Sequence, residues 1–226
     1  MSAEAQSYRH GMRAVLAIAA TVWFFAASFG LLARSSGLGV VAPLVMSATT
    51  FAGSAQFAVV SILGTSGGAA AAIAAAVLLN ARYVPISISV ASLFHGRRLR
   101  RLAEAQLIVD ESWAISSRGG GRFDRRLLIG AGLMLYAAWV TGTAVGVAGG
   151  KALGDPKDLG LDGAFPALFL ALLVPQLVGR KAQVAALLGA AIALALTPFT
   201  PAGTPIVAAS AACLLGLRPR RRRQRT

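Results

Sequence analysis

Long runs of apolar residues alternate along the chain with short polar and basic segments. A helix of roughly 20 apolar residues can cross the hydrocarbon core of a bilayer, which is about 30 Å thick, while satisfying all of its own backbone hydrogen bonds. Runs near this length lie at about residues 14 to 33, 38 to 63, 67 to 95, 127 to 150, 163 to 179, 182 to 198 and 203 to 217. The pattern predicts an all-α, polytopic membrane protein with about six to eight transmembrane segments, forming one integral membrane domain over residues 1–226.

The composition agrees with a membrane protein and argues against a soluble enzyme. Hydrophobic residues make up 56% of the chain and charged residues 13%, against about 25% charged in typical soluble domains. Motifs of nucleotide hydrolysis, of zinc hydrolases and of serine hydrolases are missing, and Cys213 is the single cysteine. We therefore expect no enzyme activity, no catalytic residue, no metal site and no cofactor.

The net charge of the chain is +14, and the positions of the charged residues are more informative than this sum. Long stretches carry no charge, which is unlike the basic surface of a nucleic-acid-binding protein. Lys and Arg accumulate on cytoplasmic loops, so segments 1–13, 96–126 and 218–226 are predicted inside, with both termini cytoplasmic and the acidic loop 151–162 outside. The basic segments are also expected to contact anionic lipid headgroups.

The N-terminal half presents a problem of parity. Three apolar segments separate Arg13 from Arg97, and three crossings cannot begin and end on the same side. We expect one segment to enter and return, or to break into two. The two candidate positions are residues 47–57, which hold four hydroxyl residues, Gly53 and Gln56, and residues 79–85, which end in Pro85. Interrupted helices of this kind are where transporters bind their substrates.

Arg82 is the one formal charge between Ser35 and Gly96. A guanidinium at membrane depth costs roughly 2.5 kcal/mol or more, so it faces a protein interior or a water-filled cavity. The functional interpretation is an anion site, for instance for a substrate carboxylate. The alternative is a helix that ends near Leu79, with Arg82 reaching to a headgroup. Asn80 is a weaker candidate for the same site.

Further polar candidates follow from the same argument. Ser54 and Gln56 lie within the first predicted break and can hydrogen-bond a polar ligand, although a membrane-embedded Gln can also bridge helices. Gly142 and Gly146 form a small-residue motif that predicts close helix packing, with Thr143 as a possible lining residue.

Three acids are candidates for proton coupling: Asp110, Glu111 and Asp162. Asp110 and Glu111 are adjacent, and adjacent residues on a helix do not face each other, so they do not form a paired-carboxylate catalytic site. The alternative for this pair is a salt bridge to the basic loops, on a short interfacial or cytoplasmic helix. Asp162 lies before the segment at 163 to 179, where a solvated loop-end aspartate is the alternative.

Five segments in the same order resemble one known family. They are FAGSAQFAVVSIL at 51–63, LLNARYVPISISVA at 78–91, the Asp110-Glu111-Ser112 triplet, WVTGTAVGVAGG at 139–150 and GLDGAFPALFLALL at 160–173. Together they resemble the AzlC family, the large subunit of bacterial branched-chain amino acid exporters. The resemblance implies export of leucine, isoleucine and valine across the bacterial inner membrane, driven by the proton motive force, with a small hydrophobic AzlD-type subunit as partner.

On this reading the substrate site is lined by Ser54, Gln56, Asn80 and Arg82, with Phe51 and Phe57 near the aliphatic side chain. Two alternatives remain: a non-transporting scaffold subunit, and an exporter of a different small amphipathic solute. A passive channel is disfavoured because the last three apolar segments contain few polar residues.

Overall fold

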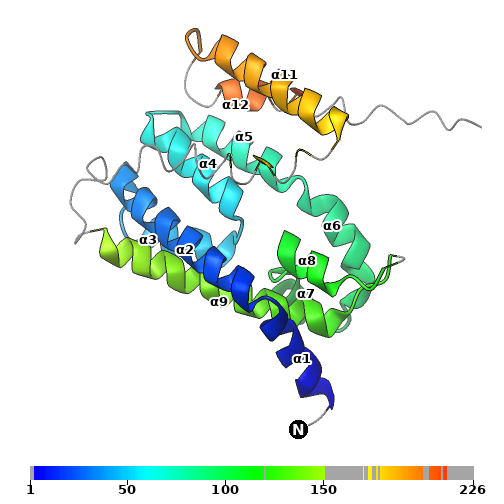
Figure 1. Ribbon diagram of the computed structural model, residues 1–226. Helices are drawn as coiled ribbons and strands as arrows, with labels where there is room; N and C mark the ends of the chain where they lie inside the picture. The colour runs from blue at the N-terminus through cyan, green and yellow to red at the C-terminus, as the bar shows by residue number, and fades with distance from the viewer. Residues whose placement is uncertain are drawn as a thin grey trace, which may run out of the picture.

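The computed structural model describes residues 3–119, 121–150, 170, 173–174, 177, 179–200, 204–209 and 211–212. Within these residues the chain is helical, apart from one isolated β-bridge between Ser117 and Phe123. Figure 1 shows the arrangement. The elements are α1 (Ala3–Ala14), α2 (Leu16–Ala33), the π-helical turn η1 (Arg34–Leu38), α3 (Val41–Thr49), α4 (Gly53–Gly64), α5 (Ala69–Asn80), α6 (Tyr83–Val90), the 3-10 turn η2 (Ala91–Leu93), α7 (Arg98–Ala105), α8 (Asp110–Ser116), α9 (Arg125–Gly149), α11 (Arg180–Leu196) and α12 (Thr204–Ala209).

Three described stretches are long and apolar enough to cross a membrane: Leu16–Leu38, Ala69–Leu93 and Arg125–Gly149. They correspond to three of the segments expected from the hydrophobic pattern, and the prediction of an all-α membrane protein is confirmed. The expected segment at 182 to 198 is the helix α11. Most of the expected segment at 163 to 179 lies outside the described residues, and so do residues 203, 210 and 213–217 of the last segment, the acidic loop 151–162 with Asp162, and the basic tail 218–226.

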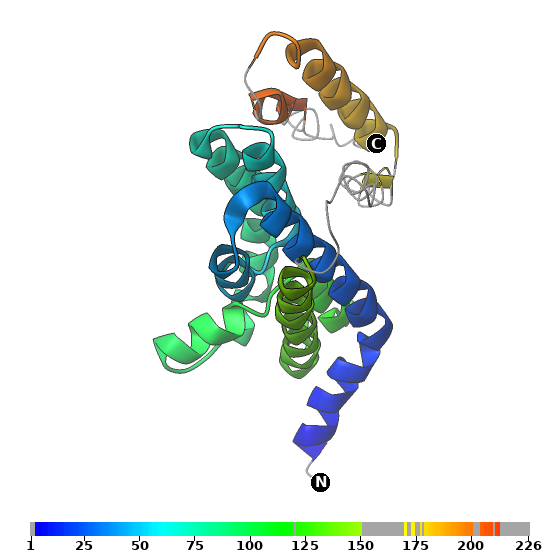
Figure 2. The same ribbon diagram turned by 90° about the vertical axis from the view of Figure 1, so that its left-hand side faces the viewer.

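Helices α2 and α9 form the centre of the fold, side by side along most of their length (Figures 1 and 2). Their backbones come very close because glycines lie at the contact. A methyl group on Gly142 or Gly146 would collide with the backbone of Trp23 or Ala27, and one on Gly30 would meet the backbone of Thr143. Small residues at such spacing allow close helix approach in membranes. The packing role predicted for Gly142 and Gly146 is therefore present.

The apolar segment at 38 to 63 does not cross the fold. It breaks at residues 50–52, where Phe51 adopts a positive φ of 43°, and the two halves form a hairpin of α3 and α4. Helix α3 begins beside the end of α2, and α4 returns to the same end, since Gly64 lies against Ser36. The tip of the hairpin reaches the middle of α9, where Tyr136 Oη donates to the Ala48 carbonyl oxygen over 2.8 Å.

The hairpin resolves the parity problem. Helix α2 runs from one end of α9 to the other, α3 and α4 turn back at the far end, and α5 and α6 run back toward the first end. Accordingly α1 and the segment after α6 lie at one end of α9: Gly11 packs on Leu127, and Leu107 packs on Gly132. Of the two predicted breaks, the first is thus a re-entrant hairpin.

The second predicted break, at residues 79–85, is a mild interruption. Ala81 and Arg82 keep helical backbone angles, but the chain tightens there, so that the Val84 amide donates to the Ala81 carbonyl three residues back. Pro85 has no amide hydrogen to continue the ladder of hydrogen bonds. The junction between α5 and α6 bends visibly in Figure 1 and projects Arg82 toward α4 and α8.

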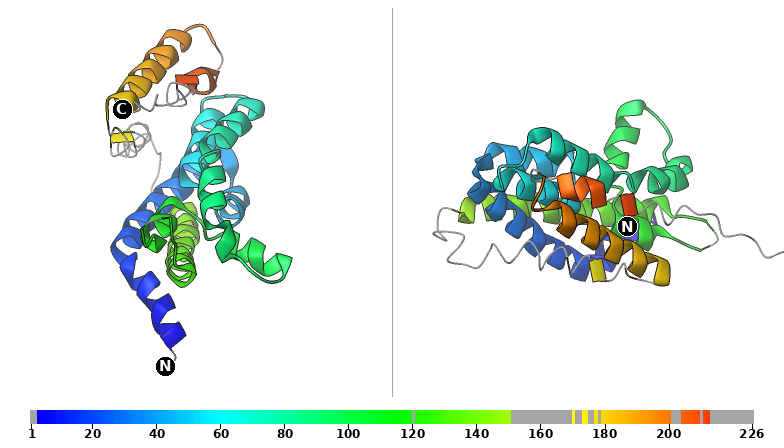
Figure 3. Two further views of the ribbon diagram at one scale, coloured as in Figure 1. Left: turned by 90° about the vertical axis from the view of Figure 1, so that its right-hand side faces the viewer. Right: turned by 90° about the horizontal axis from the view of Figure 1, so that it is seen from above.

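Helix α7 is fastened to the start of α9 by Glu104. Its buried carboxylate accepts hydrogen bonds from Arg100 Nε over 2.8 Å and from Arg125 Nε over 3.2 Å, and it also pairs with Arg125 Nη2. Burial alone would raise the pKa of Glu104, but the hydrogen bonds from the two guanidinium groups outweigh it and lower that pKa. Helices α11 and α12 pack on each other, and α12 contacts α5 (Figure 3).

Candidate functional site

A cavity of about 800 Å³ lies where the interrupted helices meet the central pair. Its walls come from α2, from the start of α4, from the junction of α5 and α6, from α8 and from α9. Every element that the sequence predicted to be broken therefore contributes to one space. This volume is within the range of small-molecule sites, which run from about 300 to 1,000 Å³.

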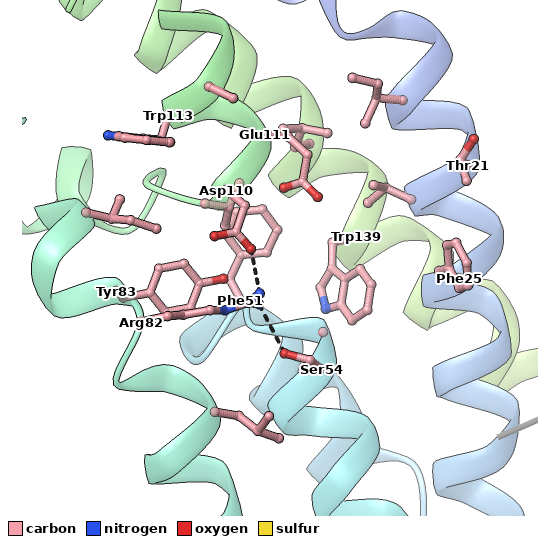
Figure 4. Close-up of a pocket in the computed structure, with 18 of the residues that line it drawn as sticks. Thr21, Phe25, Phe51, Ser54, Arg82, Tyr83, Asp110, Glu111, Trp113 and Trp139 are labelled. Carbon is pink, nitrogen blue, oxygen red and sulfur yellow. Dashed lines mark hydrogen bonds and ion pairs between the residues drawn. The ribbon is translucent and has the colours of Figure 1, made fainter. Parts of the chain in front are cut away.

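One wall of the cavity is polar and charged. Arg82 Nη1 pairs with Asp110 Oδ2 at 2.8 Å, and Arg82 Nη2 donates to Ser54 Oγ over 3.1 Å. The side chains of Arg82 and Asp110 remain 43% and 40% exposed, so both can be reached from the cavity. The ring of Tyr83 lies beside the guanidinium, 5.2 Å from its Cζ (Figure 4). Two residues predicted as substrate ligands, Ser54 and Arg82, are thus brought together, and they are joined by Asp110.

The opposite wall is aromatic and aliphatic. Trp139 of α9 faces Arg82 across the cavity, with Phe25 of α2 beside it (Figure 4). Phe51 and Phe57, which the sequence placed near an aliphatic substrate group, both line the space. Gly53 lies so close to the Trp139 ring that an added methyl group would approach the ring to 2.8 Å. The indole therefore packs directly against the backbone at the start of α4.

Glu111 also lines the cavity, and its carboxylate is directed into the space between Asp110 and Trp139 (Figure 4). Burial raises the pKa of Glu111, and the negative charge of Asp110 adds to the effect. Among the described residues, the acidic pair makes no salt bridge to the basic loops, which was one expectation. Asp110 pairs with Arg82 instead, and the short helix α8 packs against α9.

Gln56 and Thr143 occupy a different environment from the one expected, because neither side chain lines the cavity. Both belong to a buried ring of hydrogen bonds behind Trp139. Trp139 Nε1 donates to Gln56 Oε1 over 3.0 Å, and Gln56 Nε2 donates to Ser47 Oγ over 3.1 Å. Ser47 and Thr143 bond through their hydroxyls at 2.8 Å, and Thr143 donates back to the Trp139 carbonyl over 2.9 Å. The ring begins and ends on Trp139.

Asn80 lies two residues before Arg82 but outside the cavity wall. Its Oδ1 atom is buried and has no hydrogen-bond partner among the described residues. The role proposed for Asn80 in substrate binding stays a prediction.

Several cavity residues were missed by reasoning from sequence. Trp139, Tyr83, Phe25 and Trp113 line the space. Trp139 and Phe25 lie in apolar stretches where an aromatic residue is ordinary, and Trp113 lies on the short helix that carries Asp110 and Glu111. One signal was available for Tyr83, which follows the single charged residue of its segment. For the others, only the tertiary arrangement of α2, α8 and α9 identifies them.

The comparisons with known proteins agree with one another. The family described as "AzlC protein" matches residues 17–153. A protein of Archaeoglobus fulgidus, named only as an uncharacterized membrane protein, is 33% identical over 82% of this chain and 82% of its own. The branched-chain amino acid transport protein AzlC of Bacillus subtilis is 25% identical over 84% of this chain and 75% of its own. A Helicobacter pylori membrane protein is 24% identical over 74% of each chain.

No solved structure matches the chain. The matched residues 17–153 run from α2 to just beyond α9 and so include every helix that forms the cavity. Together with the relatives, which extend over most of both chains, this match identifies the protein as a membrane protein that belongs to the AzlC family.

Proposed function

We propose that the protein is the substrate-binding subunit of a secondary transporter that exports neutral branched-chain amino acids across the bacterial inner membrane. The observation that carries this proposal is the pairing of the two cavity walls. A free amino acid with an aliphatic side chain has one charged end and one apolar end. The cavity presents Arg82, Ser54 and Asp110 on one side and Trp139 and Phe57 on the other.

In the proposed complex, Arg82 holds the substrate carboxylate. Its planar guanidinium can bind a carboxylate through two parallel hydrogen bonds, and Ser54 offers a further donor once the bond between them is exchanged. The aliphatic side chain then lies against the aromatic wall. An apolar pocket separates substrates that differ by one methylene by only about 1 to 3 kcal/mol. We therefore propose that leucine, isoleucine and valine are all accepted.

The name of the Bacillus subtilis relative supports the same substrate class.

A small AzlD-type subunit and coupling to the proton motive force complete the proposal, with Asp110, Glu111 and Asp162 as candidates for the proton pathway. Anionic lipid is proposed at the basic helix α7, where Arg98 and Arg101 border a groove whose floor includes Phe94 and Ile108. An exporter of another small amphipathic solute is the alternative that the same cavity geometry allows.

The proposal is tested by transport in proteoliposomes that contain the protein with its small partner subunit. Labelled leucine should move uphill when a pH gradient is imposed, and a protonophore should abolish this movement. Arg82→Lys should reduce the rate at least tenfold, because lysine cannot bind a carboxylate through two parallel bonds. The matched control is Arg118→Lys, which alters a guanidinium paired with Asp124 outside the cavity and should leave the rate unchanged.

A different outcome would favour the scaffold alternative. If Arg82→Lys transports leucine normally while the two subunits still assemble, the cavity is not the substrate site. If the wild-type pair moves no neutral amino acid under any gradient, the exporter proposal is wrong.

A further inference from the structure

The two acids of the cavity are not equivalent. Asp110 has a counter-ion, since its Oδ2 atom lies 2.8 Å from Arg82 Nη1. Glu111 has no ion-pair partner among the described residues, although its carboxylate is directed into the same space (Figure 4). Burial of a carboxyl group favours its protonated form, and a cation placed beside it favours the ionised form.

The groups around Glu111 leave it as the acid available to a ligand. Asp110 precedes it on α8, and Arg82 and Tyr83 face it from the junction of α5 and α6. Helices α2, α4 and α9 contribute Thr21, Phe25, Ser54, Leu135 and Trp139 to the cavity, none of which is charged. Helix α1 also contacts α8, but its basic residues do not line the cavity. Burial raises the pKa of Glu111, so it keeps a proton to higher pH than an exposed glutamate does.

An amino acid bound through its carboxylate brings its ammonium group to within one carbon atom of that contact. If Arg82 holds the carboxylate, the ammonium must lie beside the charged wall, where an anion is needed to replace its lost water. Asp110 already has a cation beside it, since its Oδ2 atom lies 2.8 Å from Arg82 Nη1. Glu111 has no such partner among the described residues, so it is the carboxyl group that gains most from a bound ammonium.

We propose that Glu111 is the binding group for the α-ammonium of the substrate, and that the substrate and a proton occupy Glu111 alternately. The inference rests on the proposed function and deepens it, because it makes one carboxyl group both the substrate ligand and the coupling group. When the cavity is empty and the solution is acidic enough to protonate it, Glu111 carries a proton. When the ammonium binds, the O–H bond breaks, the carboxylate pairs with the ammonium, and the proton leaves to water in the cavity. One proton is released for each substrate bound.

Competition of this kind exchanges a substrate for a proton without a second site. The cavity carries an amino acid when it changes from facing one side of the membrane to facing the other, and it carries a proton when it changes back. The amino acid and the proton are never bound to Glu111 at the same time. It also specifies the substrate class: the ligand needs both an ammonium and a carboxylate. A carboxylate that lacks the amino group, such as 4-methylpentanoate, contacts Arg82 but displaces no proton.

The test measures proton release when leucine binds to the purified two-subunit complex, using a pH indicator in weak buffer, together with affinity as a function of pH. At a pH below the pKa of Glu111, wild-type protein should release about one proton per leucine, and its affinity should fall about tenfold for each unit by which the pH is lowered further. Glu111→Gln should bind leucine at least tenfold more weakly, without proton release and without pH dependence. Glu4→Gln, which removes an acid near the N-terminus, should behave like wild type.

A second measurement needs no variant, so it stands even if Glu111→Gln fails to fold. On wild-type protein, 4-methylpentanoate should release no proton, whereas 3-methylbutylamine, which has the amino group alone, should release one. Leucine binding without proton release would overturn the inference and leave the exporter proposal standing. Absence of binding by any neutral amino acid would overturn the exporter proposal, and this inference with it.

Discussion

At the scale of single residues, the site is built in two layers. Arg82, Ser54, Asp110 and Glu111 face the cavity and can touch a ligand directly. Gln56 lies behind them, 1% exposed, and acts through Trp139, whose indole N–H it accepts. A polar residue at membrane depth was expected to bind substrate, and its part in this structure is to hold the aromatic wall in place.

Replacement of Gln56 should therefore affect stability and selectivity together. Gln56→Leu leaves Trp139 Nε1 and the Ala52 amide without their acceptor, and an unpaired buried polar group costs about 1 to 3 kcal/mol. The freed indole should also discriminate less among leucine, isoleucine and valine. Thermal unfolding followed by tryptophan fluorescence and competition for leucine transport measure the two effects.

Thr49→Ala is the control for Gln56→Leu, because the Thr49 hydroxyl is exposed and bonds only to the Val45 carbonyl of its own helix. It should change neither quantity. A Gln56→Leu variant with wild-type melting temperature and selectivity would show that the hydrogen-bonded ring does not position Trp139.

At the scale of elements, the fold depends on the close contact of α2 and α9. The glycines on one face of α9 let the backbone of α2 come near, and this contact sets the distance between Phe25 and Trp139, which line the cavity from the two helices. Lipid tails are as apolar as the helices, so the association gains little from the hydrophobic effect and relies on close packing.

A single methyl group at this contact should be costly. Gly146→Ala places a Cβ atom against the backbone of Ala27, which cannot move aside as a flexible side chain would. Overpacking of this kind costs about 1 to 3 kcal/mol, and we expect a lower melting temperature in detergent and reduced leucine transport.

Gly189→Ala is a matched control for Gly146→Ala, since Gly189 is also helical but an added methyl group there meets only ordinary contacts, at 3.4 Å and 3.8 Å. Helix propensity favours alanine over glycine by up to about 1 kcal/mol, so this variant should be as stable as wild type or slightly more so. Equal destabilisation of both variants would contradict the role given to the α2 and α9 contact.

At the scale of the whole molecule, the hairpin of α3 and α4 determines which ends of the helices face the same compartment. The start of α3 and the end of α4 lie together beside the C-terminal end of α2, near the C-terminal end of α9. Helix α7 lies at the other end of the fold, near the start of α9. The N-terminal half therefore returns to the end of the fold at which it started, which is the arrangement predicted from the clusters of arginine in segments 1–13 and 96–126.

This topology predicts the pattern of labelling by a membrane-impermeant maleimide in intact cells. In a Cys213→Ala background, Val40→Cys and Thr65→Cys should both react from outside, because both positions are exposed at the same end of the fold. Arg97→Cys should react only after the membrane is permeabilised. Reaction of Val40→Cys and Thr65→Cys from opposite sides would mean that the segment between them crosses the membrane.

The sequence alone determined the class of the protein and the places where its helices break. Long uncharged runs can be stable only in lipid, and the hydroxyl-rich stretch at 47–57 and Pro85 weaken a helix through local chemistry that needs no tertiary information. The cost of a buried charge likewise singled out Arg82 before any neighbour was known. These inferences depend on a residue and its immediate neighbours in the chain.

Only the tertiary structure decided how these parts meet. It made the first break a hairpin and the second a bend, paired Arg82 with Asp110 rather than leaving Asp110 to the basic loops, and placed Gln56 behind the cavity rather than in it. It also left Glu111 facing the cavity without a counter-ion. Such contacts join residues 28 or more positions apart, and their partners are chosen by which helix faces fit together, a property that no local pattern records.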